Sequence, residues 1–520
     1  MIFVRENDWQ ALNLALSEMN RQLRVPVTTT KEKTTALGTV TTTTTITGGT
    51  TIGAAGNYIE NVLMNAGDMV YMGTNLQATR LPAGANSQVM TMTNGLPAWA
   101  NQGDVYNVTA YGAAGNGSTD DRSAIQSAIN SAQLSVYGGV VYFPPGEYWV
   151  SNYIEVADSN ISLIGAGMGA TTITGTGTND VIRVTGVSTP TYRDKVYISD
   201  MLVSRDSSST DPNGAGTGIR LYYASNCIIE RVTTYRQWIG FYAQGSIFSR
   251  MHNCTDSRDS GANAHYGFYI DGTTENSSLT LSNCISNASG HTGSSTGFMT
   301  FGAHVRDFYL IHCESDLCDY GMYIDTDTSN NTNIHLINPI NDSFYVTGIY
   351  IKDCEAATVT GGWSYATALG TPATSRGVYI DTCRGVKISN HISHGVANPG
   401  YNYGFAIASS QNISLVGCHA VESEYNISLN GGSYNTVQGC TCYNETSGNA
   451  ASQHIVLSGN ESKDSIGGNI LGGYYGTGIL VNVNSDKNIV LGNNIDPTNA
   501  GTATITNSGA NNVVEHNEVT

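Results

Sequence analysis

The sequence has few charged residues and especially few basic ones. Lys and Arg together number 23 among 520 residues, against 41 Asp and Glu, so the net charge is −18 and charged residues make up only 12%. Without a cluster of Lys and Arg, the chain is a poor ligand for DNA, RNA or an anionic membrane surface. We therefore expect no nucleic acid as a partner, and a neutral or mildly charged glycan fits the composition better.

Long hydrophobic runs are also absent. No stretch approaches the roughly 20 apolar residues of a membrane-spanning helix. The first residues, Met1 to Asp8, lack a basic region followed by an apolar run and a small-residue cleavage site. We therefore expect no membrane insertion and no secretory signal. No spacing of His, Cys or carboxylate residues is typical of a metal site, so neither a metal nor a cofactor is predicted.

The 10 cysteines follow the repeat of the chain and do not suggest pairs. A ladder of small, soft side chains is typical of a solenoid interior, where free Cys is readily buried. The sequence therefore predicts unpaired buried thiols, which suit folding in a reducing cytoplasm. One repeated position holds Cys254, Cys284, Cys313, Cys418 and Cys440, and a second holds Cys227, Cys354 and Cys383.

A short phrase led by Gly recurs through the middle of the chain. It reads Gly-Phe-Tyr-Ile-Asp at 267–271, Gly-Met-Tyr-Ile-Asp at 321–325 and Gly-Val-Tyr-Ile-Asp at 377–381. Apolar second and fourth positions give the period-two alternation of a strand with one buried face. A constant phrase that returns at variable spacing predicts stacked coils, in which the loops differ in length while one strand of each coil stays in register.

A second strand-like run precedes each Cys of the first group, so each coil has at least two strands joined by turns rich in Gly, Asn, Ser and Asp. We therefore predict an all-β chain with a parallel β-helix that continues to Thr520. Residues 1–26 have apolar residues three and four apart before Pro26, which predicts a short helix for coiled-coil assembly or docking.

The region between this helix and the solenoid is predicted to be a small β-rich stem, 27–103. Its Thr-rich part, 27–56, favours strands because β-branched residues resist helix, and such strands have little to bury without other copies. At the start of 104–520, Thr119 or Asp120 is expected to cap a helix near 120–132 that closes the open end of the solenoid. Asp120 and Asp121 are therefore assigned a structural role, although they look like a catalytic pair.

Two segments resemble known families. Gly67-Asp-Met-Val-Tyr-Met72 and Gly95-Leu-Pro-Ala-Trp-Ala100 resemble a short β unit that recurs in bacteriophage tail fibres and tailspikes. Gly138-Gly-Val-Val-Tyr-Phe-Pro-Pro-Gly146, within 104–175, resembles the opening of the pectate-lyase-like superfamily, which includes phage tailspike depolymerases. The resemblance implies a right-handed parallel β-helix, a homotrimer and a place on the virion tail.

The third position of the Gly-led phrase, with 302–306 as one copy, predicts an outward column of side chains. The fifth position then alternates in sign over consecutive coils, from Asp271 through Arg306 to Asp325. This face is either a wall packed against another subunit or a glycan platform, since Tyr rings offer flat apolar faces to sugars. Candidate substrate-binding residues are Tyr242, Tyr269, His304, Arg306, Tyr323, Tyr350 and Tyr379.

Counting from the Cys position brings acidic residues together. Asp316 and Asp342 fall at the same place on adjacent coils, and Glu314 lies one outward step from Asp316. Two such carboxylates repel, so one is expected to hold a proton near neutral pH, as glycoside hydrolysis needs. Asp also stabilises turns in such loops, and that alternative stays open.

These observations predict a phage tailspike or receptor-binding protein that binds and depolymerises bacterial surface polysaccharide. Its N-terminus is expected to attach to a phage tail or baseplate protein. Hydrolysis is narrowly favoured over a lyase reaction, which would use His304, Tyr323 and Arg306. One alternative is a non-enzymatic glycan-binding tail fibre or adhesin, and another is a secreted polysaccharide lyase.

Overall fold

The chain divides into two compact units, Met1–Gly103 and Asp104–Thr520. The predicted helix at 1–26 lies outside the residues that the computed structural model describes. The described residues are 27–35, 38–46, 65–74, 78–84, 88–101, 105–188, 191–206, 216–258, 264–289, 293–327, 333–366, 375–395, 401–445, 453–473, 475–496 and 500–519.

The first unit contains antiparallel hairpins. The Thr-rich stretch forms strands, as expected, and β1 (Val27–Thr35) pairs with β2 (Gly38–Ile46) of the same chain. β3 (Met69–Met72) pairs with β4 (Ala78–Leu81), and β5 (Gln88–Thr93) pairs with β6 (Leu96–Asn101). In the β3–β4 hairpin, Arg80 Nε donates a hydrogen bond of 2.8 Å to Asp68, which fixes the entry to the pair.

The second unit opens with β7 (Val105–Asn107), the 3-10 helix η2 (Val108–Tyr111), β8 (Asn116–Asp120), α3 (Arg122–Gln133) and β9 (Gly139–Phe143). The predicted helix is therefore present, and it buries Ile125 and Ile129. Its N-cap is Asp121, not Thr119 or Asp120. The Asp121 carboxylate accepts hydrogen bonds from the backbone of the 114–115 loop, and Asp120 accepts one of 2.6 Å from Ser151 Oγ. Asp120 Oδ1 also accepts the Arg122 N–H at 3.1 Å, so both carboxylates are bonded to the chain around the start of α3.

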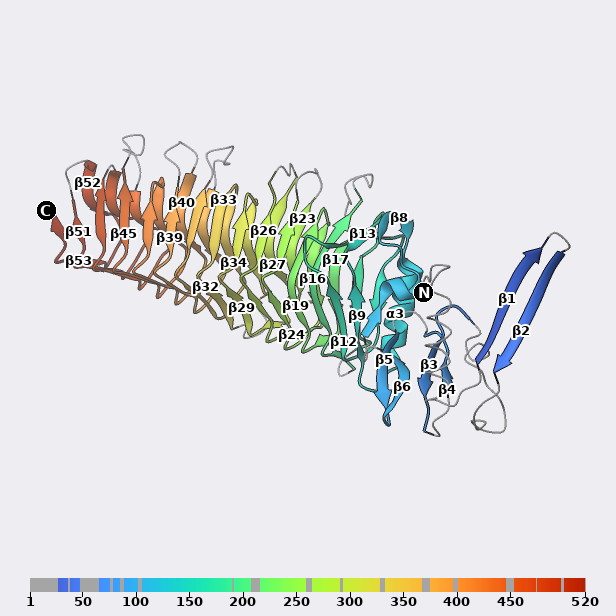
Figure 1. Ribbon diagram of the computed structural model, residues 1–520. Helices are drawn as coiled ribbons and strands as arrows, with labels where there is room; N and C mark the ends of the chain where they lie inside the picture. The colour runs from blue at the N-terminus through green and yellow to red at the C-terminus, as the bar shows by residue number, and fades with distance from the viewer. Residues whose placement is uncertain are drawn as a thin grey trace. The chain divides into compact units, whose positions relative to one another are not determined.

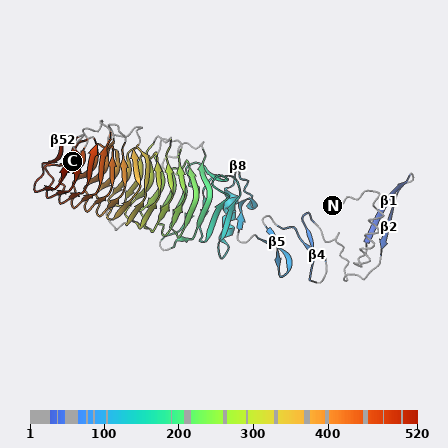
Figure 2. The same cartoon turned by 60° about the vertical axis from the view of Figure 1, so that its left-hand side comes forward.

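The rest of the unit is a parallel β-helix, as predicted, with three strands in most coils (Figures 1 and 2). The Gly-led phrases form a 14-stranded sheet, called here the phrase sheet. Its strands are β11 (Ile154–Val156), β14 (Ile182–Thr185), β17 (Thr217–Tyr222), β20 (Ile239–Gln244), β23 (His265–Asp271), β27 (Ser295–Phe301), β31 (Tyr320–Asp325), β34 (Thr347–Lys352), β37 (Ser375–Asp381), β40 (Tyr401–Ala408), β43 (Tyr425–Asn430), β46 (Gln453–Ser458), β49 (Tyr475–Val481) and β52 (Ala500–Asn507).

The other strands form a 30-stranded sheet that folds around the remaining two faces. One face, called here the Cys face because its strands follow the first Cys position, holds β10 (Gly146–Val150), β13 (Thr171–Gly175), β22 (Thr255–Ser257), β26 (Ile285–Asn287), β30 (Glu314–Asp316), β33 (Ile340–Phe344), β36 (Trp363–Ala366), β39 (Ile392–His394), β42 (His419–Val421), β45 (Thr441–Asn444), β48 (Ile470–Gly473), β51 (Asn494–Ile495) and β54 (Glu518–Val519).

The remaining face holds β12 (Ile161–Gly165), β21 (Arg250–His252), β25 (Thr280–Ser282), β29 (Phe308–Ile311), β32 (Ile334–Ile337), β35 (Ala357–Thr360), β38 (Lys387–Ser389), β41 (Ser414–Val416), β44 (Thr436–Gln438), β47 (Ser465–Gly467), β50 (Ile489–Leu491) and β53 (Val513–Glu515). The long strands β16 (Tyr197–Arg205) and β19 (Ile228–Tyr235) belong to both faces. Two small pairs, β15 (Arg193–Asp194) with β18 (Ala224–Ser225) and β24 (Asn276–Ser277) with β28 (Val305–Arg306), lie at a corner.

The solenoid interior is filled by vertical stacks of equivalent side chains. Phe268 stacks between Phe241 and Phe298, with ring centroids 4.7 and 4.8 Å apart. All ten cysteines are free and buried, as predicted. The prediction that Cys227 shares a position with Cys354 and Cys383 is wrong. Cys227 lies directly before β19, and its N–H donates a hydrogen bond to Ser249 Oγ. Cys354 and Cys383 instead lie at the corner after β34 and β37, where the Cys354 N–H donates to Cys383 Sγ.

Glycine leads each phrase because its position has no room for a side chain. A Cβ on Gly321 would lie 2.2 Å from Asn341 Oδ1, and a Cβ on Gly267 would lie 2.2 Å from Ser286 Oγ. Both neighbours are inward polar residues of the Cys face. The backbone of the phrase sheet therefore packs directly against them, and a bulkier residue would force a coil outward.

Toward the C-terminus, Asn replaces Cys in the interior. Asn469 Oδ1 accepts the Cys440 N–H at 2.8 Å, Asn493 Oδ1 accepts the Asn469 N–H at 3.1 Å, and Asn517 Oδ1 accepts the Asn493 N–H at 3.1 Å. A second such ladder joins Asn435, Asp464, Asn488 and Asn512. These ladders satisfy buried polar groups, since each side chain bonds the coil before it.

Candidate functional site

The outward side of the phrase sheet has the predicted column of tyrosines. In register, Tyr242 pairs with Tyr269, Tyr323 with Tyr350, and Tyr350 with Tyr379. The rings contact one another: Tyr350 and Tyr379 stack at 4.7 Å, and Tyr323 meets Tyr350 edge-on at 4.9 Å. The residues therefore form one file, as the repeat predicted.

Charged residues fix the orientation of this column. Tyr242 donates a hydrogen bond of 2.5 Å to Asp271 Oδ2, and the Arg220 guanidinium lies 4.2 Å above its ring. Lys352 Nζ lies 3.1 Å from Asp325 Oδ2, which is the expected attraction between opposite charges one coil apart. Burial raises the pKa of Tyr269 to about 12. The rings are thus held as neutral, preorganised platforms.

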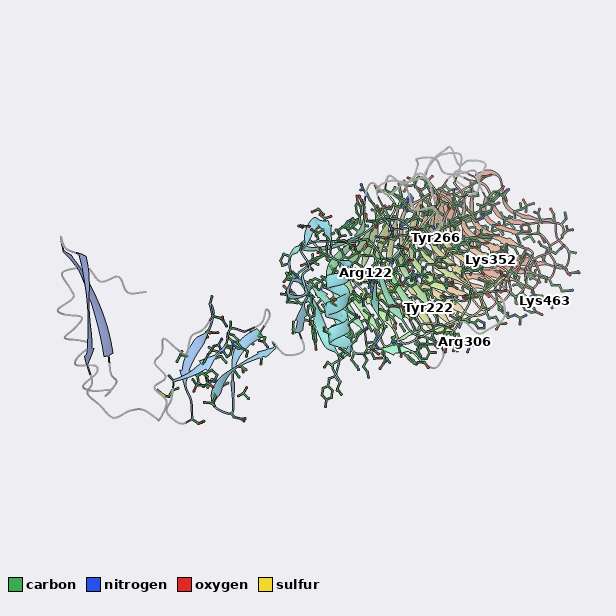
Figure 3. The ribbon with its side chains drawn as sticks, turned by 90° about the vertical axis from the view of Figure 1, so that its right-hand side faces the viewer. Arg122, Tyr222, Tyr266, Arg306, Lys352 and Lys463 are labelled. Carbon is green, nitrogen blue, oxygen red and sulfur yellow. The ribbon has the colours of Figure 1, made fainter. Side chains whose placement is uncertain are left out.

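The register predicted for His304 and Arg306 is wrong. Met299 occupies the column between Tyr269 and Tyr323, and Phe301 pairs with Asp271. Arg306 lies in β28, where it pairs with Ser277, and its nearest acidic partner is Glu275 at 3.8 Å. Figure 3 labels Arg306 well apart from Tyr266 of the phrase sheet. The lyase set of His304, Tyr323 and Arg306 is therefore not brought together, and the sign alternation is interrupted at Phe301.

A second outward column, which sequence reasoning missed, runs beside the first. Tyr266 and Tyr269 stack at 5.5 Å, and Tyr320 meets Tyr323 edge-on at 5.6 Å. In each strand, the leading Gly of the phrase and the residue after it are both buried, which interrupts the alternation of buried and outward side chains. The outward residues of the two columns are therefore three positions apart. The recurring Tyr-x-x-Tyr spacing was the available signal. This column holds Tyr266, Tyr320, Arg376, Tyr403 and Tyr425.

The three predicted acidic residues do come together on the Cys face. Asp316 pairs in register with Asp342, and Glu314 points to the same side because Ser315 between them is buried. Asn287 Nδ2 donates a hydrogen bond of 2.6 Å to Asp316 Oδ2, and Ser343 Oγ donates one of 3.0 Å to Asp342 Oδ1. Asp256, on an earlier coil, is instead fully buried and lies 2.8 Å from His265 Nε2.

The surroundings of this carboxylate cluster favour the protonated forms of Asp316 and Glu314. Burial raises the pKa of Asp316 above its ordinary value, and the negative charge of Asp342 raises it further. Burial also raises the pKa of Glu314, with added contributions from Asp316 and Asp342. Like charges at one strand spacing, about 4.8 Å, cannot both ionise freely. The cluster can therefore hold an acid and a base side by side.

Aromatic side chains flank the carboxylates on the next coils. Trp363 and Tyr365 meet edge-on with centroids 6.4 Å apart, and Tyr365 lies 5.2 Å from the ring of His394. Trp363 pairs in register with Ile340 and Tyr365 with His394. An aromatic surface beside paired acids is what a site for a sugar chain requires.

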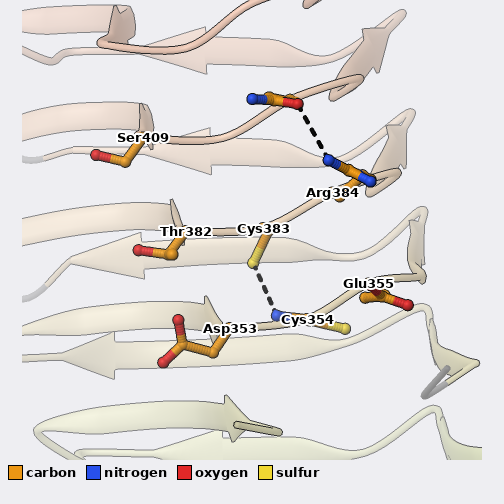
Figure 4. A pocket seen from close by; sticks show the side chains of 8 residues that line it. Asp353, Cys354, Glu355, Thr382, Cys383, Arg384 and Ser409 are labelled. Carbon is orange, nitrogen blue, oxygen red and sulfur yellow. Dashed lines mark hydrogen bonds between the residues drawn. The ribbon is translucent and has the colours of Figure 1, made fainter. Parts of the chain in front are cut away.

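A surface pocket of about 240 Å³ lies at a different corner, after β34 and β37 (Figure 4). Its lining is polar, and Arg384 donates a hydrogen bond of 3.4 Å to Gln411. No aromatic residue lines it, so it offers no stacking surface for a sugar. The lining residues are Asp353, Cys354, Glu355, Thr382, Cys383, Arg384, Ser409 and Gln411.

Two features are missing from the described ranges. No group of three or more His, Cys, Asp or Glu side chains there is arranged to hold a metal ion. In the same parts of the chain, none of the helices has the length and apolar character that crossing a bilayer would require.

The sequence profile described as rhamnogalacturonase A/epimerase, pectate lyase-like, matches residues 105–384. Alginate lyase 7 of Azotobacter vinelandii is 39% identical over 124 residues, 22% of this chain and 14% of that protein. Mannuronan C5-epimerase AlgE6 of the same organism is 51% identical over 74 residues, 13% of this chain and 8% of that protein. The chain thus covers only a small share of these relatives' length.

Two phage proteins are among the similar solved structures. Tailspike protein 3 of bacteriophage CBA120 has a TM-score of 0.56 and 15% identity, covering 82% of this chain and 65% of that chain. The pre-mature gene product 12 of bacteriophage phi29 has a TM-score of 0.61 and 17% identity, covering 77% and 57%. At these identities the likeness shows a shared fold, and with the profile match it confirms the predicted pectate-lyase-like β-helix.

Proposed function

The chain belongs to the rhamnogalacturonase A/epimerase, pectate lyase-like family, and from that premise we propose that it is a phage tailspike that binds and hydrolyses bacterial surface polysaccharide. In this proposal it is a homotrimer on the virion tail, and its N-terminal unit attaches to a tail or baseplate protein. The fold shared with phage tailspike proteins supports the setting. The names of two relatives, an alginate lyase and a mannuronan C5-epimerase, support a polysaccharide as substrate.

The observation that carries the catalytic part is the register pairing of Asp316 with Asp342. Asp316, whose pKa is raised by burial and by Asp342, donates a proton to the glycosidic oxygen. Asp342 then serves as the nucleophile or as the base that activates water. Glu314, two residues from Asp316, has a pKa raised by burial and by both Asp carboxylates, and it is a second candidate acid.

The test uses purified protein and a panel of capsular polysaccharides, O-antigens and sodium alginate. We expect shortened sugars from the wild type, and a loss of cleavage by at least about 100-fold in Asp316→Asn and Asp342→Asn, since general acid–base catalysis contributes that much or more. Glu355→Gln, which replaces an exposed carboxylate of the other corner, is the matched control and should cleave as the wild type does. Full activity in both Asn variants would contradict the assignment.

A β-eliminating lyase is the second candidate, favoured by the 39% identity to alginate lyase 7. Its products carry an unsaturated uronate that absorbs ultraviolet light, whereas hydrolysis products do not. If the panel shows binding without any shortened product, the protein is instead a non-cleaving receptor-binding fibre.

A further inference from the structure

The corner between the Cys face and the phrase sheet is short at the two coils that carry Asp316 and Asp342, and it is longer on the coils directly before and after them. There the chain turns through 317–319, between β30 and β31, and through 345–346, between β33 and β34. On the flanking coils, seven residues separate β26 from β27, and eight separate β36 from β37. The carboxylate cluster and the tyrosine columns are therefore joined by two short turns.

The two short turns are bonded to each other. The Tyr345 N–H donates to the Cys318 carbonyl at 3.0 Å, and the Val346 N–H donates to the Asp319 carbonyl at 2.9 Å. Asp319 Oδ2 accepts the Ser295 N–H at 2.9 Å, which ties this turn to the preceding coil. The corner thus continues the strand ladder without a break, and the side chains on it have fixed positions.

Tyr345 stands on this corner beside the acids. Burial raises the pKa of its phenol, with contributions from the charges of Asp319 and Asp316, so the ring lies within electrostatic reach of both carboxylates. The side chain is half-buried. Within the described ranges, no hydrogen bond is found for its hydroxyl group, which therefore presents a ring face and a donor to a ligand.

Arg376 stands on the other side of the same corner. Its N–H donates to the Val346 carbonyl at 2.9 Å, and it pairs in register with Thr347. Its guanidinium lies 4.3 Å from the Tyr379 ring centroid and 5.6 Å from that of Tyr403. No carboxylate of the described residues forms an ion pair with it, so aromatic faces hold the cation while its N–H donors stay available.

We infer that a polysaccharide chain crosses this corner, held by Tyr345 and Arg376, so that one binding surface extends from the tyrosine columns to Asp316 and Asp342. This inference rests on the proposed function. A sugar stacks on the Tyr345 ring, and Arg376 donates hydrogen bonds to oxygens of the next units. Because the surface spans two faces of the solenoid, chains of several sugar units bind better than short fragments, which reach only part of it.

The experiment measures binding in the Asp316→Asn background and cleavage in the active protein, with the polysaccharides of the panel and their size-fractionated fragments. Tyr345→Ala and Arg376→Gln are each expected to weaken binding of long chains about 3- to 10-fold, the effect of losing one stacked ring or one guanidinium contact. KM should rise more for long chains than for the shortest fragments. Tyr345→Phe keeps the ring and should retain most of the affinity.

Two variants serve as matched controls. Tyr443→Ala removes an exposed tyrosine of β45, and Arg384→Gln removes an arginine of the other corner. Both should bind as the parent does, and thermal melting confirms that each variant is folded. If the parent binds while Tyr345→Ala and Arg376→Gln match these controls, the crossing is overturned and the proposed function stands. Weakening by Trp363→Ala alone places the glycan along the Cys face instead. A wild type that neither binds nor cleaves any polysaccharide overturns both proposals.

Discussion

Asp316 and Asp342 stand opposite each other in the register of β30 and β33, with Asp316 accepting a hydrogen bond from Asn287 on the coil before. The pair is set by strand stacking, which fixes both backbones at one strand spacing. Its chemistry therefore depends on the β-helix itself and not on a loop.

The pH profile of cleavage should lose activity as the pH rises through the raised pKa of Asp316. The pKa of this carboxyl lies above its ordinary value of 3.8, so the acid stays protonated at a higher pH than an exposed Asp would. Activity is present below the raised pKa and declines above it. Initial rates over a pH series report the midpoint. Glu355→Gln should leave the profile unchanged, and a rate that increases with pH through that whole range would contradict the role of Asp316.

Cleavage should retain the configuration of the anomeric carbon. Adjacent parallel strands are about 4.8 Å apart, and retaining enzymes use carboxyls about 5–5.5 Å apart, whereas inverting ones need about 6.5–9.5 Å. Proton NMR of the first products distinguishes the two outcomes. An inverted product would show that Asp316 and Asp342 are not the pair that acts, or that water enters between them.

Gly321→Ala should destabilise the β-helix by about 1–3 kcal/mol, the usual cost of overpacking. The added Cβ would lie 2.2 Å from Asn341 Oδ1 and 2.5 Å from Ser315 Oγ, both inside the solenoid. Gly169→Ala is the control, because nothing lies within 4 Å of a Cβ at that turn. Chemical denaturation of the two variants measures the difference, and equal stabilities would mean that the coil widens at little cost.

The stability of the last coils should fall as the pH rises toward about 9. Glu461 is fully buried, and burial and the nearby Asp464 carboxyl raise its pKa from 4.5 to about 9. The native state therefore holds a proton that the unfolded chain has already lost, so stability is greatest below pH 4.5 and falls until the pH passes about 9. In thermal melts across this pH range, Glu461→Gln should reduce the dependence of stability on pH. An unchanged dependence would mean that other groups cause it.

No cysteine should react with a thiol reagent in the native protein. All ten are free and buried, and burial raises the pKa of Cys227 to about 11, which suppresses the reactive thiolate. Titration with a chromogenic disulfide reagent should show reaction only after unfolding, when all ten thiols respond. Melting temperatures with and without reductant should coincide. A reductant-sensitive melt would reveal a disulfide.

The repeat was sufficient to predict the solenoid and the carboxylate cluster. Strands that recur with the same phrase stack in a single register. Counting three residues from Cys313 and from Pro339 therefore predicted correctly that Asp316 and Asp342 are neighbours. The same counting went wrong at 297–306, where two Gly-led runs lie close together. Only packing chooses between them: Phe298 stacks on Phe268, and Met322 then pairs with Phe298.

Two features that the repeat did not predict depend on local departures from regular strands. The second tyrosine column needs the buried pair of residues at each phrase start, such as Gly321 and Met322, which places Tyr320 and Tyr323 on one side. The corner at Tyr345 depends on the length of two turns relative to their neighbours. Neither feature follows from hydrophobic periodicity, because both arise where the period changes.

The amide ladders at the C-terminal end also give the stack a direction. Because each Asn oxygen receives an N–H from the coil before it, removing the coil of Asn512 and Asn517 would leave the buried N–H groups of Asn488 and Asn493 without acceptors. Removing the coil of Asn493 as well would leave the Asn469 N–H without its acceptor. Shortening the solenoid from this end therefore exposes an equivalent defect at each step, while lengthening it by one more Asn-bearing coil preserves every bond already made.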